Sequence, residues 1–286
     1  MIKEKISSLL SEEEEVLSVE QLGGMTNQNY LVKTTNKQYI VKFFGKGTEK
    51  LINRQDEKYN LELLKDLDLD VKNYLFDIEA GIKVNEYIES AITLDSTSIK
   101  TKFDKIAPIL QTIHASGREL KGEFAPFEEI KKYESLIQGE ISYPNYEAVR
   151  KAVFSLKEEL EQIGIDKKSC HIDLVPENFI EGPDGHLYLI DWEYSSMNDP
   201  MWDLAALFLE SEFTSAEEED FLSHYESDKT PVSREKIRIY KILQDIIWSL
   251  WTIYKEENGA DFGDYGISRY NRAVKELESE GDLNEN

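Results

Sequence analysis

The spacing of the apolar residues changes near residue 98 and divides the chain into two parts. Residues 16–44 contain short runs rich in Val, Tyr, Ile and Phe, a composition typical of β-strands. Residues 49–66 carry apolar groups at helical spacing, and residues 71–88 return to short β-like runs. Helical spacing dominates after residue 98, apart from two short strands predicted within residues 179–191. These patterns predict an α+β fold.

The order of these patterns also predicts two lobes. We expect a small β-rich N-terminal lobe over residues 1–84, a hinge over residues 85–88, and a larger, mainly helical C-terminal lobe over residues 89–286. A length of 286 residues is sufficient for both lobes to bury a core.

Acidic residues greatly outnumber basic residues. The chain has 57 Asp and Glu against 33 Lys and Arg, which gives a formal net charge of −24 at pH 7. Such a surface repels nucleic acid and anionic membranes and favours cationic ligands. We therefore expect neither nucleic acid nor a membrane as a partner, and the oligomeric state stays open.

Cysteine usage and the apolar runs bear on the compartment. A single cysteine, Cys170, excludes an intrachain disulfide, which is consistent with a reducing environment. The first residues, "MIKEKISSLLSEEEE", are charged and lack the apolar segment of a signal peptide. No apolar run approaches the length of a membrane span, so we expect a cytoplasmic protein.

The segment "CHIDLVPENF", residues 170–179, places polar groups among apolar ones. One interpretation is a surface turn, because Pro176 interrupts the run and Asp, Glu and Asn favour turns. The other is a catalytic loop. His171, Asp173 and Asn178 fit the spacing H-x-D-x-x-x-x-N, with which phosphotransferases place a base and a metal ligand. His171 then supports the loop.

Phosphoryl transfer also needs a cover for the phosphates, and "GGMTNQ" is a candidate. It lies between two predicted strands, and glycine lets backbone N–H groups approach anionic oxygens closely. We predict that Gly23, Gly24, Thr26 and Asn27 contact the nucleotide. An ordinary hairpin turn is the alternative, because the segment is not a G-x-G-x-x-G motif.

The remaining parts of a phosphotransferase site follow in the expected chain order. Lys42, in "YIVKFFG", is a candidate for the strand lysine that reaches the phosphates, and Glu57 on the next predicted helix can pair with it. Solvent exposure is the alternative for both side chains. Glu86 and Tyr87, in the predicted hinge, are further candidates for contact with ATP.

The predicted metal ligands are Asn178 and Asp191. Asp191 ends the short apolar strand in "LYLIDWE" and follows Asn178 closely in the chain. Both side chains offer the hard oxygen atoms that Mg²⁺ prefers, and Mg²⁺ takes its remaining ligands from water and phosphate. Asp173 is then the group that accepts the proton of the substrate hydroxyl.

Aromatic residues gather after the predicted catalytic loop. All four tryptophans lie there, and Trp248 and Trp251 share one face of a predicted helix in "DIIWSLWTIYK". Core packing is the common role of such a pair. The alternative is a site for a quaternary ammonium ion, which cannot donate hydrogen bonds and binds to aromatic faces.

The segments "GGMTNQNYLV", "HIDLVPEN", "LIDWEYSSMNDPMWDLA", "WSLWTIY" and "DFGDYGISRY" together resemble the bacterial choline kinases of the LicA type. The resemblance spans nearly the whole chain. That family belongs to a wider choline/ethanolamine and aminoglycoside phosphotransferase group with a protein-kinase-like fold. It implies phosphorylation of choline to phosphocholine, dependent on ATP and Mg²⁺.

The resemblance also implies roles for individual residues. Asp173 matches the base, and Asn178 and Asp191 match the metal ligands. The side chains expected to bind choline are Glu193, Tyr194, Trp248, Trp251, Phe262 and Tyr265.

Three alternatives stay open. A kinase for ethanolamine or another small amino alcohol would bind a primary ammonium, which needs several hydrogen-bond acceptors. An aminoglycoside kinase would also suit an acidic chain, but its site should be a carboxylate-lined groove. A nucleotide-binding pseudokinase would lack one of Asp173, Asn178 or Asp191, and all three are present.

Overall fold

The computed structural model describes residues 14–24, 27–45, 47–279, 281 and 283. The chain forms two compact units. The first unit contains the described residues up to Ser98 and the segment Pro176–Ser195, and the second contains Ile99–Val175 and the described residues from Ser196 onward. The segment with Asn178 and Asp191 therefore packs with the N-terminal residues. The predicted lobe boundaries and hinge stay a prediction.

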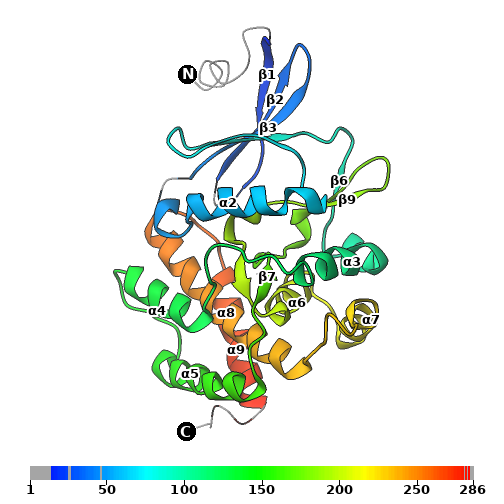
Figure 1. Cartoon of the computed structure of the whole chain (residues 1–286). Helices are drawn as coiled ribbons and strands as arrows, with labels where there is room; N and C mark the ends of the chain where they lie inside the picture. Colours follow the sequence, from blue (N-terminus) through cyan, green and yellow to red (C-terminus); the bar gives the residue numbers. More distant parts are fainter. Residues whose placement is uncertain (1–13, 25–26, 46, 280, 282, 284–286) are drawn as a thin grey trace. The chain divides into compact units, whose positions relative to one another are not determined.

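The first unit is built on an antiparallel sheet with the strand order β1-β2-β3-β5-β4, of which β1, β2 and β3 are labelled in Figure 1. Side chains alternate between the two faces of a strand, and one face carries a core that includes Val32, Val41 and Ile82. Lys42 and Lys83, one position further along, lie on the opposite face and are paired in register. The strands are β1 (Val16–Gln21), β2 (Gln28–Thr34), β3 (Gln38–Phe43), β4 (Asn73–Asp77) and β5 (Ile82–Glu86).

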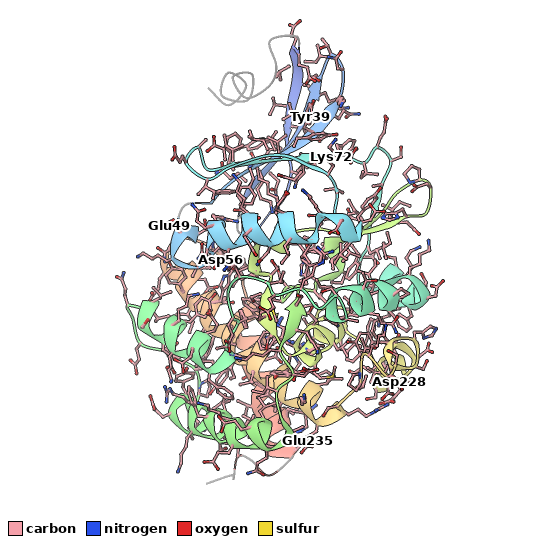
Figure 2. All side chains as sticks on the ribbon, in the orientation of Figure 1. Tyr39, Glu49, Asp56, Lys72, Asp228 and Glu235 are labelled. Carbon is pink, nitrogen blue, oxygen red and sulfur yellow. The ribbon has the colours of Figure 1, made fainter. Side chains whose placement is uncertain are left out.

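The outer end of this sheet is held by polar contacts. The hydroxyl of Tyr39, labelled in Figure 2, donates to Glu14 at 2.9 Å. The turn between β2 and β3 is closed by the N–H of Thr34, which donates to the carbonyl of Lys37 at 2.9 Å. The two strands therefore form an antiparallel hairpin.

Helix α2 (Arg54–Leu64) crosses below the sheet in Figure 1. The helix predicted over residues 49–66 is in fact interrupted, because a separate 3₁₀ turn (Thr48–Lys50) precedes it. Asn53 caps α2 by accepting hydrogen bonds from the N–H groups of Gln55 and Asp56. A second 3₁₀ turn (Lys65–Leu67) follows it. The cap fixes Arg54 as the first residue of the helix.

A second small sheet in the first unit has the order β6-β8-β9. A turn joins β8 to β9, where Gly185 donates its N–H to the carbonyl of Gly182 at 2.9 Å. Two 3₁₀ turns flank these strands, Pro176–Asn178 before β8 and Trp192–Tyr194 after β9. The strands are β6 (Ile92–Thr93), β8 (Phe179–Glu181) and β9 (Leu187–Leu189).

The second unit is mainly helical, and α8 lies at its centre. Side chains are buried around nearly the whole circumference of α8 between Ile237 and Tyr254, where α4, α5, α6 and α9 pack against it. β7 (Lys168–Cys170) pairs with β10 (Ser196–Asn198). The helices are α3 (Phe103–His114), α4 (Pro126–Leu136), α5 (Tyr146–Ile163), α6 (Pro200–Glu210), α7 (Ser215–Tyr225), α8 (Arg234–Glu257) and α9 (Tyr265–Ser279).

Together the two units confirm the α+β class predicted from the sequence. Within the described ranges, no helix combines the length and the apolar composition needed to span a membrane.

Candidate active site

Lys42 and Asp191 form a close ion pair in the first unit. The Nζ atom of Lys42 lies 2.5 Å from Oδ1 of Asp191, and the lysine side chain is buried. Burial by itself lowers the pKa of Lys42, but the carboxylates of Asp191 and Glu193 outweigh it and hold that pKa above its usual value. The lysine therefore stays charged, which suits a group that neutralises phosphate.

Asp191 has an unusual backbone conformation. It follows β9 with φ 67° and ψ 58°, in the left-handed region. Aspartate tolerates this region better than most residues do, and such conformations are often found at functional sites. The turn directs the chain from the end of β9 into the 3₁₀ turn Trp192–Tyr194.

The partner of Glu57 differs from the prediction. We expected Glu57 to pair with Lys42, but its Oε1 atom accepts from Nζ of Lys83 at 3.0 Å and its Oε2 atom from Nη1 of Arg54 at 2.7 Å. Lys83 lies directly opposite Lys42 in the register of β3 and β5. Lys83, on the neighbouring strand β5, therefore forms the ion pair with Glu57 that we had expected Lys42 to form.

Glu193 is also held by neighbours within the first unit. Its Oε2 atom accepts from Nη1 of Arg54 at 2.9 Å and from Nδ2 of Asn27 at 2.7 Å. Burial raises the pKa of Glu193 above its usual value, and the charge of Asp191 adds to this effect. The contact of Glu193 with a substrate, expected from the sequence, stays a prediction.

The glycine segment is shaped by close backbone contacts. An added Cβ at Gly24 would lie 2.7 Å from the carbonyl oxygen of Asn27 and 2.7 Å from Nδ2 of Asn29, so a larger residue does not fit there. Gly23 is exposed, and its carbonyl accepts from Nδ2 of Asn29 at 2.9 Å. Thr26, also predicted to contact the nucleotide, lies outside the described residues.

Asn178 and Asp191 belong to the same unit, and a backbone hydrogen bond joins their segments. Asn178 ends the 3₁₀ turn before β8 and is buried, and its carbonyl accepts from the N–H of Ile190 at 2.8 Å. An amide oxygen and a carboxylate oxygen are suitable ligands for Mg²⁺. The donor set therefore fits the predicted metal.

Glu86 and Tyr87 stand at the end of the main sheet. Glu86 is the last residue of β5, and its N–H donates to the carbonyl of Lys72 at 2.8 Å. Tyr87 follows it and is half-buried. Their predicted contact with ATP stays a prediction.

The segment that precedes Asp173 is held by Asp203, a residue that the sequence reasoning missed. The two carboxylate oxygens of Asp203 accept from the backbone N–H groups of His171 and Ile172, each at 2.8 Å. Ile172 has φ 78°, which is strained for a β-branched residue, and its carbonyl accepts from Nε1 of Trp202 at 3.0 Å. The backbone next to Asp173 is therefore fixed on both sides of the strained residue.

His171 itself is completely buried within the second unit. This position fits the expectation that it supports the loop. A sequence signal for Asp203 existed, because "MNDPMWDLAALFLE" places an acid inside an otherwise apolar helix. Such an acid needs hydrogen-bond donors, and backbone N–H groups supply them here.

His114, Cys170 and Asp203 place possible metal ligands within 4.8 Å of one another. Both ring nitrogens of His114 are already engaged, Nδ1 with the hydroxyl of Tyr225 at 2.7 Å and Nε2 with Asp203 at 3.1 Å. Burial raises the pKa of the Cys170 thiol well above its usual value, so the thiol stays protonated. This cluster is a hydrogen-bonded support for the loop.

The predicted aromatic group forms a continuous series in the second unit. Ring centroids are 6.5 Å apart for Trp248 and Trp251, 5.0 Å for Trp251 and Phe262, and 6.5 Å for Phe262 and Tyr265. Trp248 is half-buried and Trp251 is buried. Nε1 of Trp251 has no hydrogen-bond partner among the described residues. The series presents π faces and few polar groups.

Asp173 lies within electrostatic range of two tyrosines. Burial raises the pKa of Tyr265 and of Tyr133, and in both cases the charge of Asp173 contributes. Tyr133, on α4, is buried and was not predicted as a site residue. Tyr133 lies far along the chain from the other aromatic residues, so nothing in the sequence pointed to it. Asp173 therefore shares one unit with the aromatic series.

The other two tryptophans are core residues. Trp192 and Trp202 are almost completely buried, and Nε1 of Trp192 donates to the carbonyl of Leu189 at 2.7 Å. Trp192 belongs to the first unit and Trp202 to the second. Tyr194, also in the first unit, is half-buried, and its predicted contact with substrate stays a prediction.

Solved structures define the class of this fold. The crystal structure of the choline kinase LicA from Streptococcus pneumoniae is 85% identical and has a TM-score of 0.93, with coverage of 97% of this chain and 98% of that one. A structure of LicA in complex with AMP is 86% identical, with a TM-score of 0.92 and coverage of 97% of each chain. The chain therefore has a kinase-like fold.

Sequence comparison defines the family. The choline/ethanolamine kinase family model matches residues 19–238. Protein LicA of Haemophilus influenzae is 32% identical over 269 residues, which cover 89% of this chain and 99% of that protein. This chain belongs to the choline/ethanolamine kinase family.

Proposed function

We propose that this chain is a choline kinase, which transfers the γ-phosphate of ATP to the hydroxyl of choline and releases phosphocholine and ADP. The observation that carries the choice of substrate is the series Trp248, Trp251, Phe262 and Tyr265, in the same unit as Asp173. The family and the solved relatives support the phosphotransferase chemistry.

The first unit is proposed to bind the nucleotide. Lys42, kept charged by the carboxylates of Asp191 and Glu193 despite its burial, would pair with phosphate oxygens once a nucleotide competes for its ammonium group. Asn178 and Asp191 would hold Mg²⁺, which when bound offsets negative charge on the phosphates. The complex of LicA with AMP supports a nucleotide site in this family.

Asp173 is proposed as the base. Its carboxylate accepts the hydroxyl proton of choline while the oxygen forms a bond to the γ-phosphorus and the bond from that phosphorus to ADP breaks. The hydrogen bonds from His171 and Ile172 to Asp203 fix the backbone that precedes this carboxylate. Most of the catalysis is then positioning and charge stabilisation.

The aromatic series is proposed to bind the trimethylammonium group. A methylated cation gains from the negative faces of aromatic rings and forms no hydrogen bonds. A primary ammonium has three N–H donors, which need acceptors that such rings do not supply. We therefore expect choline to be preferred over ethanolamine, the other substrate class named by the family.

A coupled assay of ADP release tests this proposal. Choline, ethanolamine and kanamycin are compared at equal concentrations, with Mg²⁺ and ATP in excess. We expect the highest kcat/KM for choline. A higher value for ethanolamine would reassign the substrate, and ATP turnover that depends on none of the three would reject an amino-alcohol or aminoglycoside kinase.

A further inference from the structure

Arg54 is a buried cation to which the proposed mechanism gives no role. It begins α2, and its guanidinium lies 4.1 Å from the centroid of the Phe44 ring. Its Nη1 atom donates to Glu57 at 2.7 Å and to Glu193 at 2.9 Å, and its Nη2 atom donates to Oδ1 of Asn27 at 2.9 Å. One side chain thus joins three segments of the first unit.

The side-chain amide of Asn27 is engaged on both of its ends. Oδ1 accepts from Nη2 of Arg54 and from the N–H of Gly45 at 3.3 Å, while Nδ2 donates to Glu193 at 2.7 Å. We expected Asn27 to contact the nucleotide. Its side chain ties the glycine segment to Arg54 and Glu193, and its contact with the nucleotide stays a prediction.

The fork geometry of Arg54 matters as much as its charge. Glu57 also accepts from a second cation, Lys83, at 3.0 Å, whereas the Glu193 carboxylate accepts from Arg54 and from the neutral amide of Asn27. A guanidinium donates in several fixed directions in one plane, and an ammonium group is a compact point charge on a flexible stem. Lysine at position 54 would keep the charge but lose the fixed fork that contacts all three partners.

We propose that Arg54 is a positioning residue for the metal-bound nucleotide. By holding Asn27 and Glu193 in one hydrogen-bonded group, it sets the glycine segment and the segment that carries Asp191 in a common arrangement. Glu193 follows Asp191 by two residues through a 3₁₀ turn, so a shift of Glu193 moves the carboxylate of Asp191. This inference rests on the proposed function, in which both segments contact Mg²⁺ and ATP.

The first test separates KM values. Arg54→Met should raise the KM for Mg-ATP by roughly tenfold, the size expected from losing a charge-assisted hydrogen bond, and should raise the KM for choline by a smaller factor. Arg54→Lys should give an intermediate increase, because charge is kept and the fork is lost. Arg150→Met is the control, since Arg150 also forms a two-pronged pair, with Glu134 at 2.5 Å and 3.0 Å, in the second unit.

The second test separates positioning from stability. Arg54→Met leaves Glu193 buried without its cation, which should lower the melting temperature. Arg54→Met combined with Glu193→Gln removes both charges and should regain most of that stability. If Arg54 positions the nucleotide, the double variant keeps the raised KM for Mg-ATP. A KM that returns to the wild-type value together with stability would overturn the proposal.

Calorimetry of Mg-ATP binding without any acceptor makes the inference independent of choline. If the wild type binds Mg-ATP but phosphorylates no choline, the proposed function fails, and the affinities of the variants still test Arg54. If Arg54→Met binds Mg-ATP with the wild-type affinity, after correction for the fraction of folded protein, the inference is contradicted. If Arg54→Met does not fold, Arg54→Lys and the double variant decide it by the same comparison.

Discussion

Buried charge around Lys42 is organised by specific pairs. Lys42 contacts Asp191, Lys83 contacts Glu57, and Arg54 bridges Glu57 and Glu193. Three cations thus face three carboxylates inside the first unit. Breaking one buried pair leaves an uncompensated charge, which typically costs about 3–5 kcal/mol. Variants in this group therefore need a stability measurement beside every kinetic one.

Asp173→Asn tests the proposed base. Asparagine keeps the shape of the side chain but cannot accept the hydroxyl proton, so kcat should fall by roughly two or more orders of magnitude. The melting temperature and the affinity for Mg-ATP should stay close to wild type. A kcat within a few-fold of wild type would remove Asp173 from the role of base.

Asp191→Ala tests the proposed metal ligand. Activity should be lost, and calorimetry should show a larger loss of ATP affinity with Mg²⁺ than without it, because the carboxylate acts on the nucleotide through the metal. The variant also removes the partner of Lys42, so its melting temperature is measured in parallel. Equal losses of affinity with and without Mg²⁺ would argue against metal binding by Asp191.

Asp70 should give the folded protein a dependence on pH. Burial raises the pKa of Asp70 to about 7, against the attraction of Lys83. Between the unfolded pKa of about 4 and the folded value, the folded state holds a proton that the unfolded state has lost, so stability falls as pH rises through this window. Urea unfolding should therefore show a flatter pH dependence for Asp70→Asn than for wild type. If the free energy of unfolding changes equally with pH in both proteins between pH 4.5 and 7, this assignment is contradicted.

At the scale of elements, α8 combines a structural role with the proposed role in binding choline. Its buried face forms the centre of the second unit, while Trp248 and Trp251 begin the aromatic series. Trp248 is half-buried, which leaves part of its ring for a ligand, whereas Trp251 is buried and could act in the core alone. The two tryptophans therefore require separate variants.

Trp248→Ala and Trp251→Ala distinguish cation binding from core packing. A desolvated cation–π contact is worth up to about 2 kcal/mol, so the loss of one ring should raise the KM for choline by roughly tenfold or more. The affinity for Mg-ATP should hardly change, and the preference for choline over ethanolamine should narrow. If these tryptophans serve only the core, each variant loses about 3–5 kcal/mol of stability and its folded fraction keeps the wild-type KM for choline.

Local pattern was sufficient to predict most elements. The β-rich runs at residues 16–44 became β1, β2 and β3, and the helical spacing that dominates after residue 98 became the helices α3 to α9. The helix predicted over residues 49–66 was too long, because the cap at Asn53 starts a separate helix. Caps depend on local hydrogen bonds that hydrophobic spacing does not report.

The support of the candidate site was mostly beyond sequence reasoning. Arg54, Lys83 and Asp203 are charged residues that a single sequence places on the surface by default, yet all three are buried and paired. Apart from Glu57, which follows Arg54 by three residues, their partners lie far along the chain, so only the packed fold shows them. The motif residues Asp173, Asn178 and Asp191 could be proposed from the sequence alone, because their spacing along the chain is specific.

At the scale of the molecule, each compact unit contains part of the proposed kinase site. The first contains Lys42, Asn178 and Asp191, and the second contains Asp173 and the aromatic series. The buried charges around Lys42 cancel one another, so they contribute nothing to the net charge of −24. Most of the excess acid is therefore on other residues, where it favours the approach of a cation such as choline.

The most direct test of the central claim is to identify the product by phosphorus NMR. The wild-type protein is incubated with ATP, Mg²⁺ and an equal mixture of choline and ethanolamine, beside a sample with EDTA. We predict phosphocholine and ADP in equal amounts, little phosphoethanolamine, and no transfer in EDTA. Phosphoethanolamine as the main product, or inorganic phosphate without phosphocholine, would contradict the account.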